Sequence, residues 1–165
     1  MNMKAKLNLS SVEKSSVKRQ YLTMRIGKQL FGIVVDTVQD VLSPMKITPI
    51  PLSPPEVKGA LNLRGRIVTA INLRAKLGMD ELEAENSEYR SVVIELEGNL
   101  YSIIIDSVAE VLSIGDDQIE RLPENISPKW RDVSIGVYPM EKELMIFLDV
   151  GKILNVEEVL EEEEG

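Results

Sequence analysis

The chain has 165 residues, of which 44% are hydrophobic and only 4% aromatic, and its net charge at neutral pH is −8. It contains no cysteine and no histidine, which excludes disulfides, thiolate nucleophiles, zinc ribbons and the most common general base and metal ligand. We therefore expect a protein of the cytoplasm that needs no cofactor and no metal, and whose function is recognition rather than catalysis.

The charge is uneven along the chain. Six glutamates lie between positions 157 and 164, whereas residues 1–18 are polar and rich in serine and lysine. Residues 1–18 lack the apolar region of a signal peptide, and no apolar run approaches the roughly 18 residues of a membrane span. Neither end combines basic and aromatic residues as nucleic-acid-binding surfaces do. We expect a flexible leader over 1–18, no membrane insertion and no nucleic-acid binding.

The first structured region is predicted to begin with a β-hairpin. Residues 21–26 alternate between apolar and polar, and Gly27-Lys28 provides a turn into a second strand over 29–35. Apolar residues then recur at i, i+3 and i+4 over 38–42, which predicts a short turn of helix. The segment 44–55 holds five prolines and is expected to be extended or turning, with an edge strand at most.

A second hairpin is expected after the proline-rich segment. Residues 58–63 and 66–72 are apolar-rich and flank Arg64-Gly65, which predicts two strands joined by a tight turn. A helix over 73–77 follows, and Gly78 is placed to cap its C-terminus.

The same plan recurs in the second half of the chain. An acidic connector over 79–88 leads to strands at 89–96 and 100–105, joined by a turn at Gly98-Asn99. The remaining predicted elements are a short strand near 119–122, a polar loop over 123–133, a hairpin of strands 135–139 and 144–150, and a final helix over 151–164.

Two blocks of sequence show that this recurrence is an internal duplication. Residues 31–43 (FGIVVDTVQDVLS) and 101–113 (YSIIIDSVAEVLS) share six identical and five conservative positions of thirteen, and 67–77 also aligns with 144–154. We predict a mainly β fold of two five-stranded barrels. The expected domains are the leader 1–18, a first barrel half 19–84, a second barrel half 85–150, and a C-terminal helix with acidic tail 151–165.

The duplicated Asp36 and Asp106 allow two interpretations. Two carboxylates, each after an apolar pair and before Thr or Ser, are how an aspartic protease builds its catalytic pair. That site needs a glycine after the Thr or Ser, and here Val38 and Val108 occupy those positions. The second interpretation is that each Asp caps a helix, which Gln39 supports by completing a capping box after Asp36. We favour helix capping and keep the protease as a remote alternative.

Arg64 and the glutamate tail are also ambiguous by pattern alone. At a turn tip, Arg64 projects from a rigid support and suits a carboxylate or a carbonyl group of a partner, but such a residue is also commonly a solubilising one. The glutamates of 157–164 could bind cations or a basic partner, although such runs are more often solvated helix ends. We expect disorder in the tail and assign it no function.

The segment 57–78 (VKGALNLRGRIVTAINLRAKLG), together with the two I-x-x-D-x-V-x-x-V-L-S blocks, resembles the CheW family of bacterial chemotaxis coupling proteins. The resemblance covers about residues 20–155. It implies two SH3-like five-stranded β-barrels and a helix near the C-terminus. It also implies a non-enzymatic adaptor, monomeric when isolated, that bridges the regulatory domain of the histidine kinase CheA to the cytoplasmic tip of methyl-accepting chemoreceptors. The protein would then be recruited to membrane-associated receptor arrays.

The same resemblance implies where the partners bind. Kinase contacts are expected from the second barrel, at residues that the resemblance does not specify. Two departures from the family pattern, Asn72 and Ser102, look structural. The receptor-facing residues carried over by motif are Val38, Asp40, Gly59, Asn62, Arg64 and Gly65.

The main alternative function keeps the fold but changes the pathway. The chain could be a coupling module of another signalling system or of a CheV-type protein. A CheV-type protein is expected to continue after residue 155 into a receiver domain, and this sequence ends at Gly165.

Overall fold

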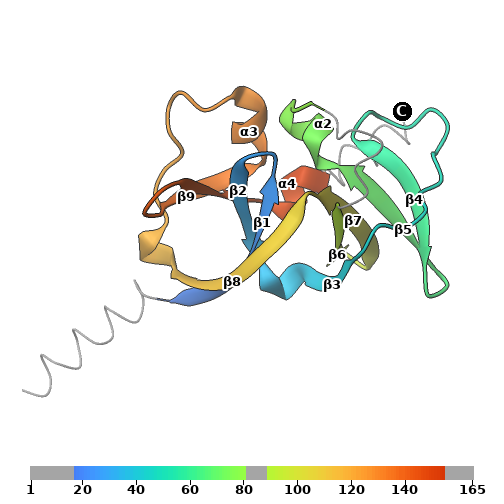
Figure 1. The fold of residues 1–165 in the computed structure, drawn as a ribbon, viewed down its shortest axis with the longest axis horizontal. Helices are drawn as coiled ribbons and strands as arrows, with labels where there is room; N and C mark the ends of the chain where they lie inside the picture. The colour runs from blue at the N-terminus through green and yellow to red at the C-terminus, as the bar shows by residue number, and fades with distance from the viewer. Residues whose placement is uncertain (1–16, 81–88, 155–165) are drawn as a thin grey trace, which may run out of the picture.

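The described residues form two curved β-sheets that lie side by side, with three short helices on one side (Figure 1). The computed structural model describes residues 17–80 and 89–154. The strands are β1 (Lys18–Ile26), β2 (Gln29–Val34), β3 (Val38–Leu42), β4 (Val57–Leu63), β5 (Arg66–Asn72), β6 (Arg90–Leu96), β7 (Asn99–Ile105), β8 (Ser107–Gly115), β9 (Ser134–Pro139) and β10 (Leu144–Leu148). The α-helices are α2 (Leu73–Leu77), α3 (Pro128–Val133) and α4 (Val150–Leu154), and two 3-10 turns are η1 (Val35–Thr37) and η2 (Asp116–Gln118).

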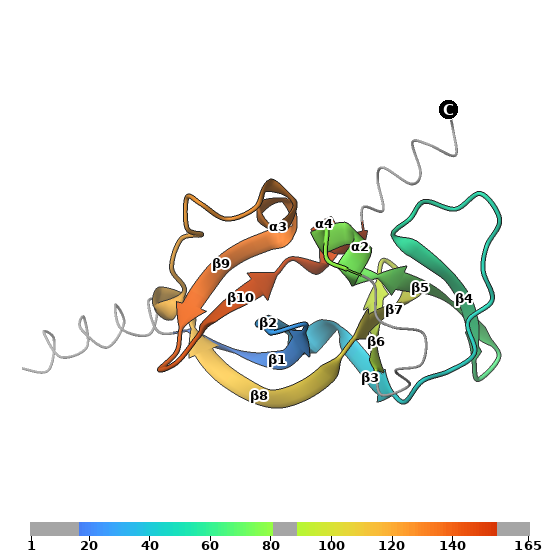
Figure 2. The same ribbon diagram turned by 45° about the horizontal axis from the view of Figure 1, so that its top comes forward.

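Each sheet has five strands and its two edges are brought together. The sheet with order β8-β1-β2-β10-β9 is called barrel A, and the sheet with order β3-β6-β7-β5-β4 is called barrel B (Figure 2). Beyond β8, an isolated bridge joins Glu120 to Val137 of β9, and beyond β3 a matching bridge joins Thr48 to Ala60 of β4. The prediction of a mainly β fold with two five-stranded barrels is therefore confirmed.

The two barrels do not follow the two halves of the sequence. Barrel A combines β1 and β2 of the first repeat with β8, β9 and β10 of the second, and barrel B combines β6 and β7 with β3, β4 and β5. The division into halves 19–84 and 85–150 thus separates strands that pair in one sheet. The predicted leader 1–18 and tail 151–165 lie largely outside the described residues.

The chain changes barrel at the repeated sequence block. Only η1 separates β2 from β3, and only Asp106 separates β7 from β8. The strand that the chain leaves already has a neighbour on each side, β1 and β10 for β2, and β6 and β5 for β7. The next strand could join its own hairpin only beyond β1 or β6, two strand spacings or about 9.6 Å away. Four Cα steps through the 3-10 turn η1 cover about 8 Å, and two steps through Asp106 cover at most about 7 Å. The third strand of each repeat therefore pairs with the hairpin of the other repeat: β3 with β6, and β8 with β1.

The predicted helical turn at 38–42 is wrong. These residues form strand β3, in which half-buried and exposed positions alternate, and the equivalent segment forms the long strand β8, which was not predicted. Antiparallel pairing with a neighbouring hairpin favours the strand, since the β-branched valines suit it. Asp36 is no helix cap: it lies inside η1, whose N-cap is Val34, and Gln39 is exposed.

Most other local predictions are confirmed. The β1–β2 and β4–β5 hairpins turn at Gly27-Lys28 and Arg64-Gly65 as expected, whereas β6–β7 turns at Glu97-Gly98, one residue before the predicted Gly98-Asn99. Gly78 caps α2 in the left-handed conformation with φ of 69°. Asn72 caps the start of α2 by accepting a hydrogen bond from the backbone N–H of Ala75, as Asp149 does for Lys152 in α4. The predicted loop 123–133 instead contains α3, and the predicted helix 151–164 is described only as far as Leu154.

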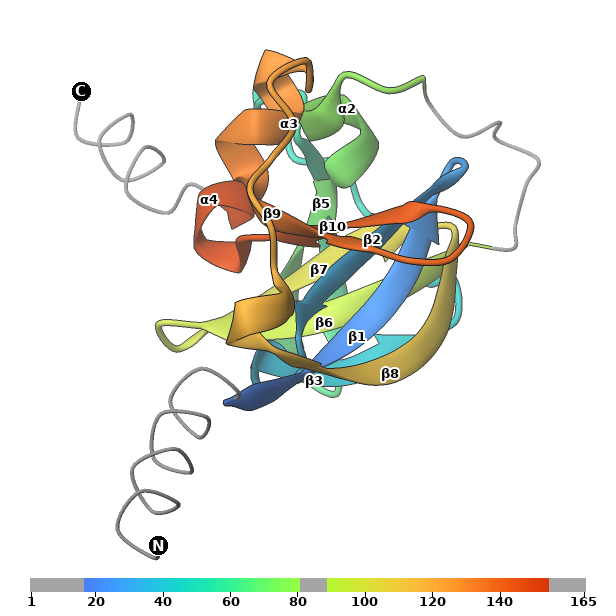
Figure 3. The same cartoon turned by 90° about the vertical axis from the view of Figure 1, so that its left-hand side faces the viewer.

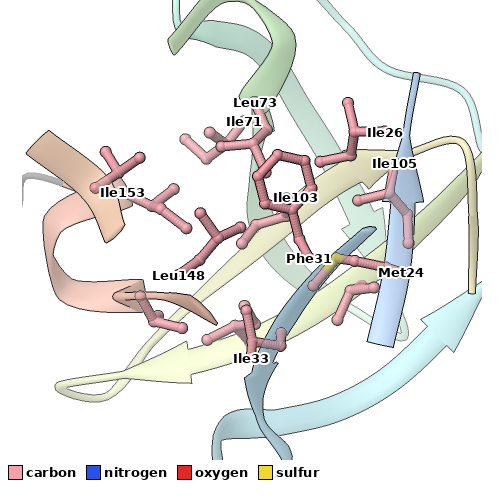
Figure 4. Packing of buried hydrophobic residues seen from close by; sticks show 14 of the residues in the cluster. Met24, Ile26, Phe31, Ile33, Ile71, Leu73, Ile103, Ile105, Leu148 and Ile153 are labelled. Carbon is pink, nitrogen blue, oxygen red and sulfur yellow. The ribbon is translucent and has the colours of Figure 1, made fainter. Parts of the chain in front are cut away.

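One hydrophobic core fills the junction of both barrels. Its buried side chains include Phe31 and Ile33 from barrel A, Ile103 and Ile105 from barrel B, and Ile153 from α4 (Figure 4). Each barrel has in addition a smaller cluster of its own. Because apolar burial is the main favourable term in folding, neither barrel is expected to be stable without the other.

An ion pair at one crossover ties the two barrels together. Asp106 accepts a 2.7 Å hydrogen bond from the Arg74 guanidinium at the start of α2, and another of 2.8 Å from the backbone N–H of Gly27 in the β1–β2 turn. Both side chains are largely buried, with relative exposures of 13% for Arg74 and 26% for Asp106. At the other crossover Asp36 is exposed and makes no such contact with the described residues.

This difference predicts unequal effects of matched substitutions. Asp106→Ala leaves the Arg74 charge largely buried without its partner, and we expect a loss of about 2 kcal/mol in the free energy of unfolding, below the full cost for a completely buried pair. Asp36→Ala at the equivalent position should change it by less than about 0.5 kcal/mol. Urea denaturation of both variants checks this, and equal losses would show that the Asp106–Arg74 pair does not tie the barrels together.

Candidate partner-binding surfaces

The β4–β5 hairpin presents a rigid basic tip at one end of barrel B. Arg64 and Gly65 both have positive φ, of 50° and 86°, the combination that a two-residue hairpin turn of type I′ requires. The Asn62 side chain fixes this turn, because its Oδ1 accepts a 2.9 Å hydrogen bond from the backbone N–H of Gly65. The Arg64 side chain stays 78% exposed.

The tip is joined to the opposite edge strand of the same sheet. The Arg64 guanidinium donates a 3.3 Å hydrogen bond to Oδ2 of Asp40 in β3. The structure thus brings together Asp40, Asn62, Arg64 and Gly65, four of the six residues predicted to face a receptor. An exposed pair of this kind adds little to stability, which leaves the guanidinium available to a partner.

Gly59 and Val38 occupy positions inside the barrel wall. Gly59 has φ of 153°, and a Cβ placed on it would lie 2.3 Å from the carbonyl oxygen of Thr48. Gly59 therefore permits the backbone approach that closes barrel B, and Gly136 does the same beside Glu120 in barrel A. Val38 is half-buried and packs against the main core. For both residues direct contact with a partner stays a prediction.

Exposed apolar residues near this tip were not predicted from the sequence. Ile67 is 70% exposed and lies opposite Asn62 in the β4–β5 pairing, and Val41 in β3 is 39% exposed. A hollow of about 400 Å³ is lined by Met45, Lys46, Thr48, Ala60, Leu61, Asn62 and Ile67. Because side chains alternate between the two faces of a strand, one of Ile67 and Val68 must face outward. This pattern in 66–72 could have predicted an exposed apolar residue here.

Barrel A carries a surface of different chemistry at the equivalent positions. Val111 and Leu144 are exposed where the first repeat has Val41 and Ile67, but Glu141 replaces Arg64. The adjacent Glu143 accepts two hydrogen bonds from Arg25, of 3.0 and 2.7 Å, and this contact holds the pKa of the Glu143 carboxyl below its usual value. The β9–β10 turn thus carries Glu141, Lys142 and Glu143 where the β4–β5 turn carries Arg64, Gly65 and Arg66, so that a glutamate replaces the exposed arginine.

Among the described residues, neither a metal-ligand cluster nor a pair of carboxylates in a shared environment is found. No group of three or more His, Cys, Asp or Glu able to hold a metal occurs among residues 17–80 and 89–154. Asp106 is bonded to Arg74 and Gly27 whereas Asp36 is exposed, so the two carboxylates lack the shared environment of an aspartic-protease pair. No helix in the described part of the chain is long and apolar enough to cross a membrane.

Comparison with known proteins identifies the family to which these two fused barrels belong. The CheW-like domain family matches residues 20–158. The Chemotaxis protein CheW of Treponema pallidum (strain Nichols) is 29% identical over 143 residues, covering 85% of this chain and 84% of that protein. The protein of the same name from Thermotoga maritima is 30% identical over 137 residues, covering 82% and 87%.

A solved structure agrees with this result. The scaffolding protein TtCheW from Thermoanaerobacter tengcongensis superposes with a TM-score of 0.70 at 25% sequence identity, over 80% of this chain and 89% of that one. The chain therefore belongs to the CheW-like family of chemotaxis scaffold proteins.

Two substitutions separate structural from exposed positions at this surface. Gly59→Ala forces a Cβ against the Thr48 carbonyl, and we expect it to lower the free energy of unfolding by about 3 kcal/mol or more. Arg64→Ala should change it by less than about 0.5 kcal/mol, since the side chain is exposed. Thermal unfolding followed by circular dichroism measures both, and a large loss in Arg64→Ala would mean that the tip serves folding rather than binding.

Proposed function

We propose that this protein is a scaffold that couples methyl-accepting chemoreceptors to the histidine kinase CheA by binding both, without catalysis. The observation that carries the proposal is the pairing of two equivalent but chemically different surfaces on one shared core. The Arg64 tip with Val41 and Ile67 belongs to barrel B, and the Glu141 tip with Val111 and Leu144 belongs to barrel A. Membership of the CheW-like family supports the choice of partners.

The barrel B surface suits the cytoplasmic tip of a receptor. Exposed apolar side chains beside a hollow can receive the apolar face of a helix, as in helix-in-groove recognition. The planar guanidinium of Arg64 can pair with a carboxylate or carbonyl group at the edge of that contact. On this proposal Asp40 and Asn62 hold the arginine and its turn in place, through the bonds described above.

The kinase surface is assigned to barrel A. The second half predicted from sequence, 85–150, contributes β8, β9 and β10 to barrel A and β6 and β7 to barrel B, and we place the kinase contacts on its strands in barrel A. Its exposed apolar residues Val111, Ile135 and Leu144 have relative exposures of 52%, 52% and 36%. Small apolar surfaces with a polar rim are typical of specific but reversible interfaces.

Coupling then follows from binding free energies. Suppose that a receptor state binds barrel B more tightly in one arrangement of the assembly than in another. The difference in binding free energy then shifts the equilibrium between the states of the kinase. The shared core supports this mechanism, because residues from both barrels pack in one cluster. A displacement at one surface is then transmitted to the other through close-packed side chains.

Equivalent valines of the two repeats provide the test. Val111→Glu should weaken binding of the CheA regulatory domain at least tenfold, or about 1.4 kcal/mol, and leave binding of a receptor-tip fragment unchanged. Val41→Glu should have the opposite effect. Both are solvent-exposed on paired strands, so thermal unfolding controls for folding, and calorimetry with each partner measures affinity.

The pattern of losses decides the assignment. If Val111→Glu weakens only the receptor and Val41→Glu only the kinase, the two surfaces have been assigned to the wrong partners. If each variant weakens both partners equally while remaining folded, the division of labour between the barrels is wrong.

A further inference from the structure

The three helices surround a basic hollow that the proposed function does not use. It lies where α2, α3 and α4 gather on one side of the barrels (Figure 3) and has a volume of about 700 Å³. None of the residues that line it is among those assigned above to receptor or kinase. It is lined by Glu56, Ala75, Lys76, Lys129, Arg131, Asp132, Val133 and Lys152.

Its wall is held in a fixed arrangement. The Trp130 indole of α3 donates a 2.9 Å hydrogen bond to the Leu77 carbonyl at the end of α2, and its ring packs against Phe31 at 5.4 Å between centroids. The Lys129 side chain lies over Gly78, where a Cβ would come within 3.0 Å of it. The wall of the hollow is therefore formed by helices that pack against each other.

Positive charge predominates in the hollow. Four cations line it against the carboxylates of Glu56 and Asp132, and the Arg131 guanidinium is directed to the carbonyls of Pro123 and Glu124. Lys129 and Lys152 are exposed and form no ion pair with the described part of the chain. An acidic ligand would supply the missing partners.

We propose that this hollow binds the chain's own acidic C-terminal segment, the glutamates of 157–164. Lys152, which lines the hollow, lies only five positions before Glu157. Residues 155–165 contain six glutamates and no positively charged residue. Because three residues span at most about 11 Å, Glu157 is within reach of the helix that carries Lys152.

Because the C-terminal segment belongs to the same chain, weak contacts are sufficient for it to occupy the hollow. Each exposed ion pair contributes at most about 1 kcal/mol, so a free peptide of this sequence should bind only weakly. Attachment gives the segment an effective concentration in the millimolar range, so a dissociation constant of about 1 mM in trans leaves the hollow about half occupied in cis. The segment then acts as an internal competitor that must be displaced before another anionic ligand binds. This inference is independent of the receptor and kinase assignments.

The test compares the full chain with a chain ending at Leu154 by NMR of backbone amides. We expect shift differences at α2, α3 and Lys152 that disappear at high salt, since screening weakens exposed pairs. A synthetic peptide of residues 155–165 should restore the shifts when added to the shortened chain, at least threefold less effectively at 0.3 M than at about 0.03 M salt. A peptide with all six glutamates replaced by glutamine should not restore them.

Paired variants give the control. Lys129→Glu with Lys152→Glu in the full chain should abolish the differences, whereas Lys28→Glu with Lys142→Glu, exposed lysines on the hairpin turns, should leave them intact. The proposal is overturned if differences between the two chains are confined to the residues next to the cut, or if they survive the Lys129 and Lys152 substitutions. Shifts that depend on protein concentration would also overturn it, since they would place the segment on a second copy.

Discussion

The exchange of strands between the two repeats is the constraint on which the rest of the structure depends. The chain leaves its first hairpin through η1 and its second through Asp106, and in each case the strand just left already has a neighbour on both sides. Each barrel is therefore completed by the other repeat, and one core forms across both. The two exposed surfaces are fixed relative to one another as a consequence, which is what a scaffold between two partners requires.

Comparison of the two repeats separates positions that maintain the fold from positions that give each barrel its own surface. Asn72 and Asp149 both cap a helix, and Gly59 and Gly136 both allow a close backbone approach at a barrel-closing bridge. By contrast, Arg64 aligns with Glu141. The two repeats thus have similar backbones, and differences at exposed positions make their surfaces chemically distinct.

Local signals in the sequence were sufficient for the hairpins, because turns at positions such as Gly27-Lys28 and Arg64-Gly65 depend on neighbouring residues alone. They were insufficient for 38–42 and 107–115, where pairing with a distant hairpin outweighs apolar residues at helical spacing. The helix at 128–133 had a local signal that was not used: Ser127 followed by Pro128 is a typical helix start.

The candidate surface was also only partly predictable from local sequence. The position of Arg64 at a turn tip followed from local sequence, but its ion pair with Asp40 depends on closure of barrel B. The role of Gly59 depends on Thr48, a residue of the proline-rich segment, and no pattern within a single strand reveals such an approach. The basic hollow also escaped prediction, because its cations come from three helices separated along the chain.

Two separate surfaces should allow one molecule to bind both partners at once, each through a different barrel. Calorimetric titration with the CheA regulatory domain, alone and in the presence of a saturating receptor-tip fragment, measures this. We expect a saturable one-to-one complex whose formation the receptor fragment does not prevent. Loss of kinase binding in proportion to added receptor fragment would contradict two separate surfaces. Absence of kinase binding at high micromolar concentration, confirmed by a second method, would instead indicate a coupling module of another signalling pathway.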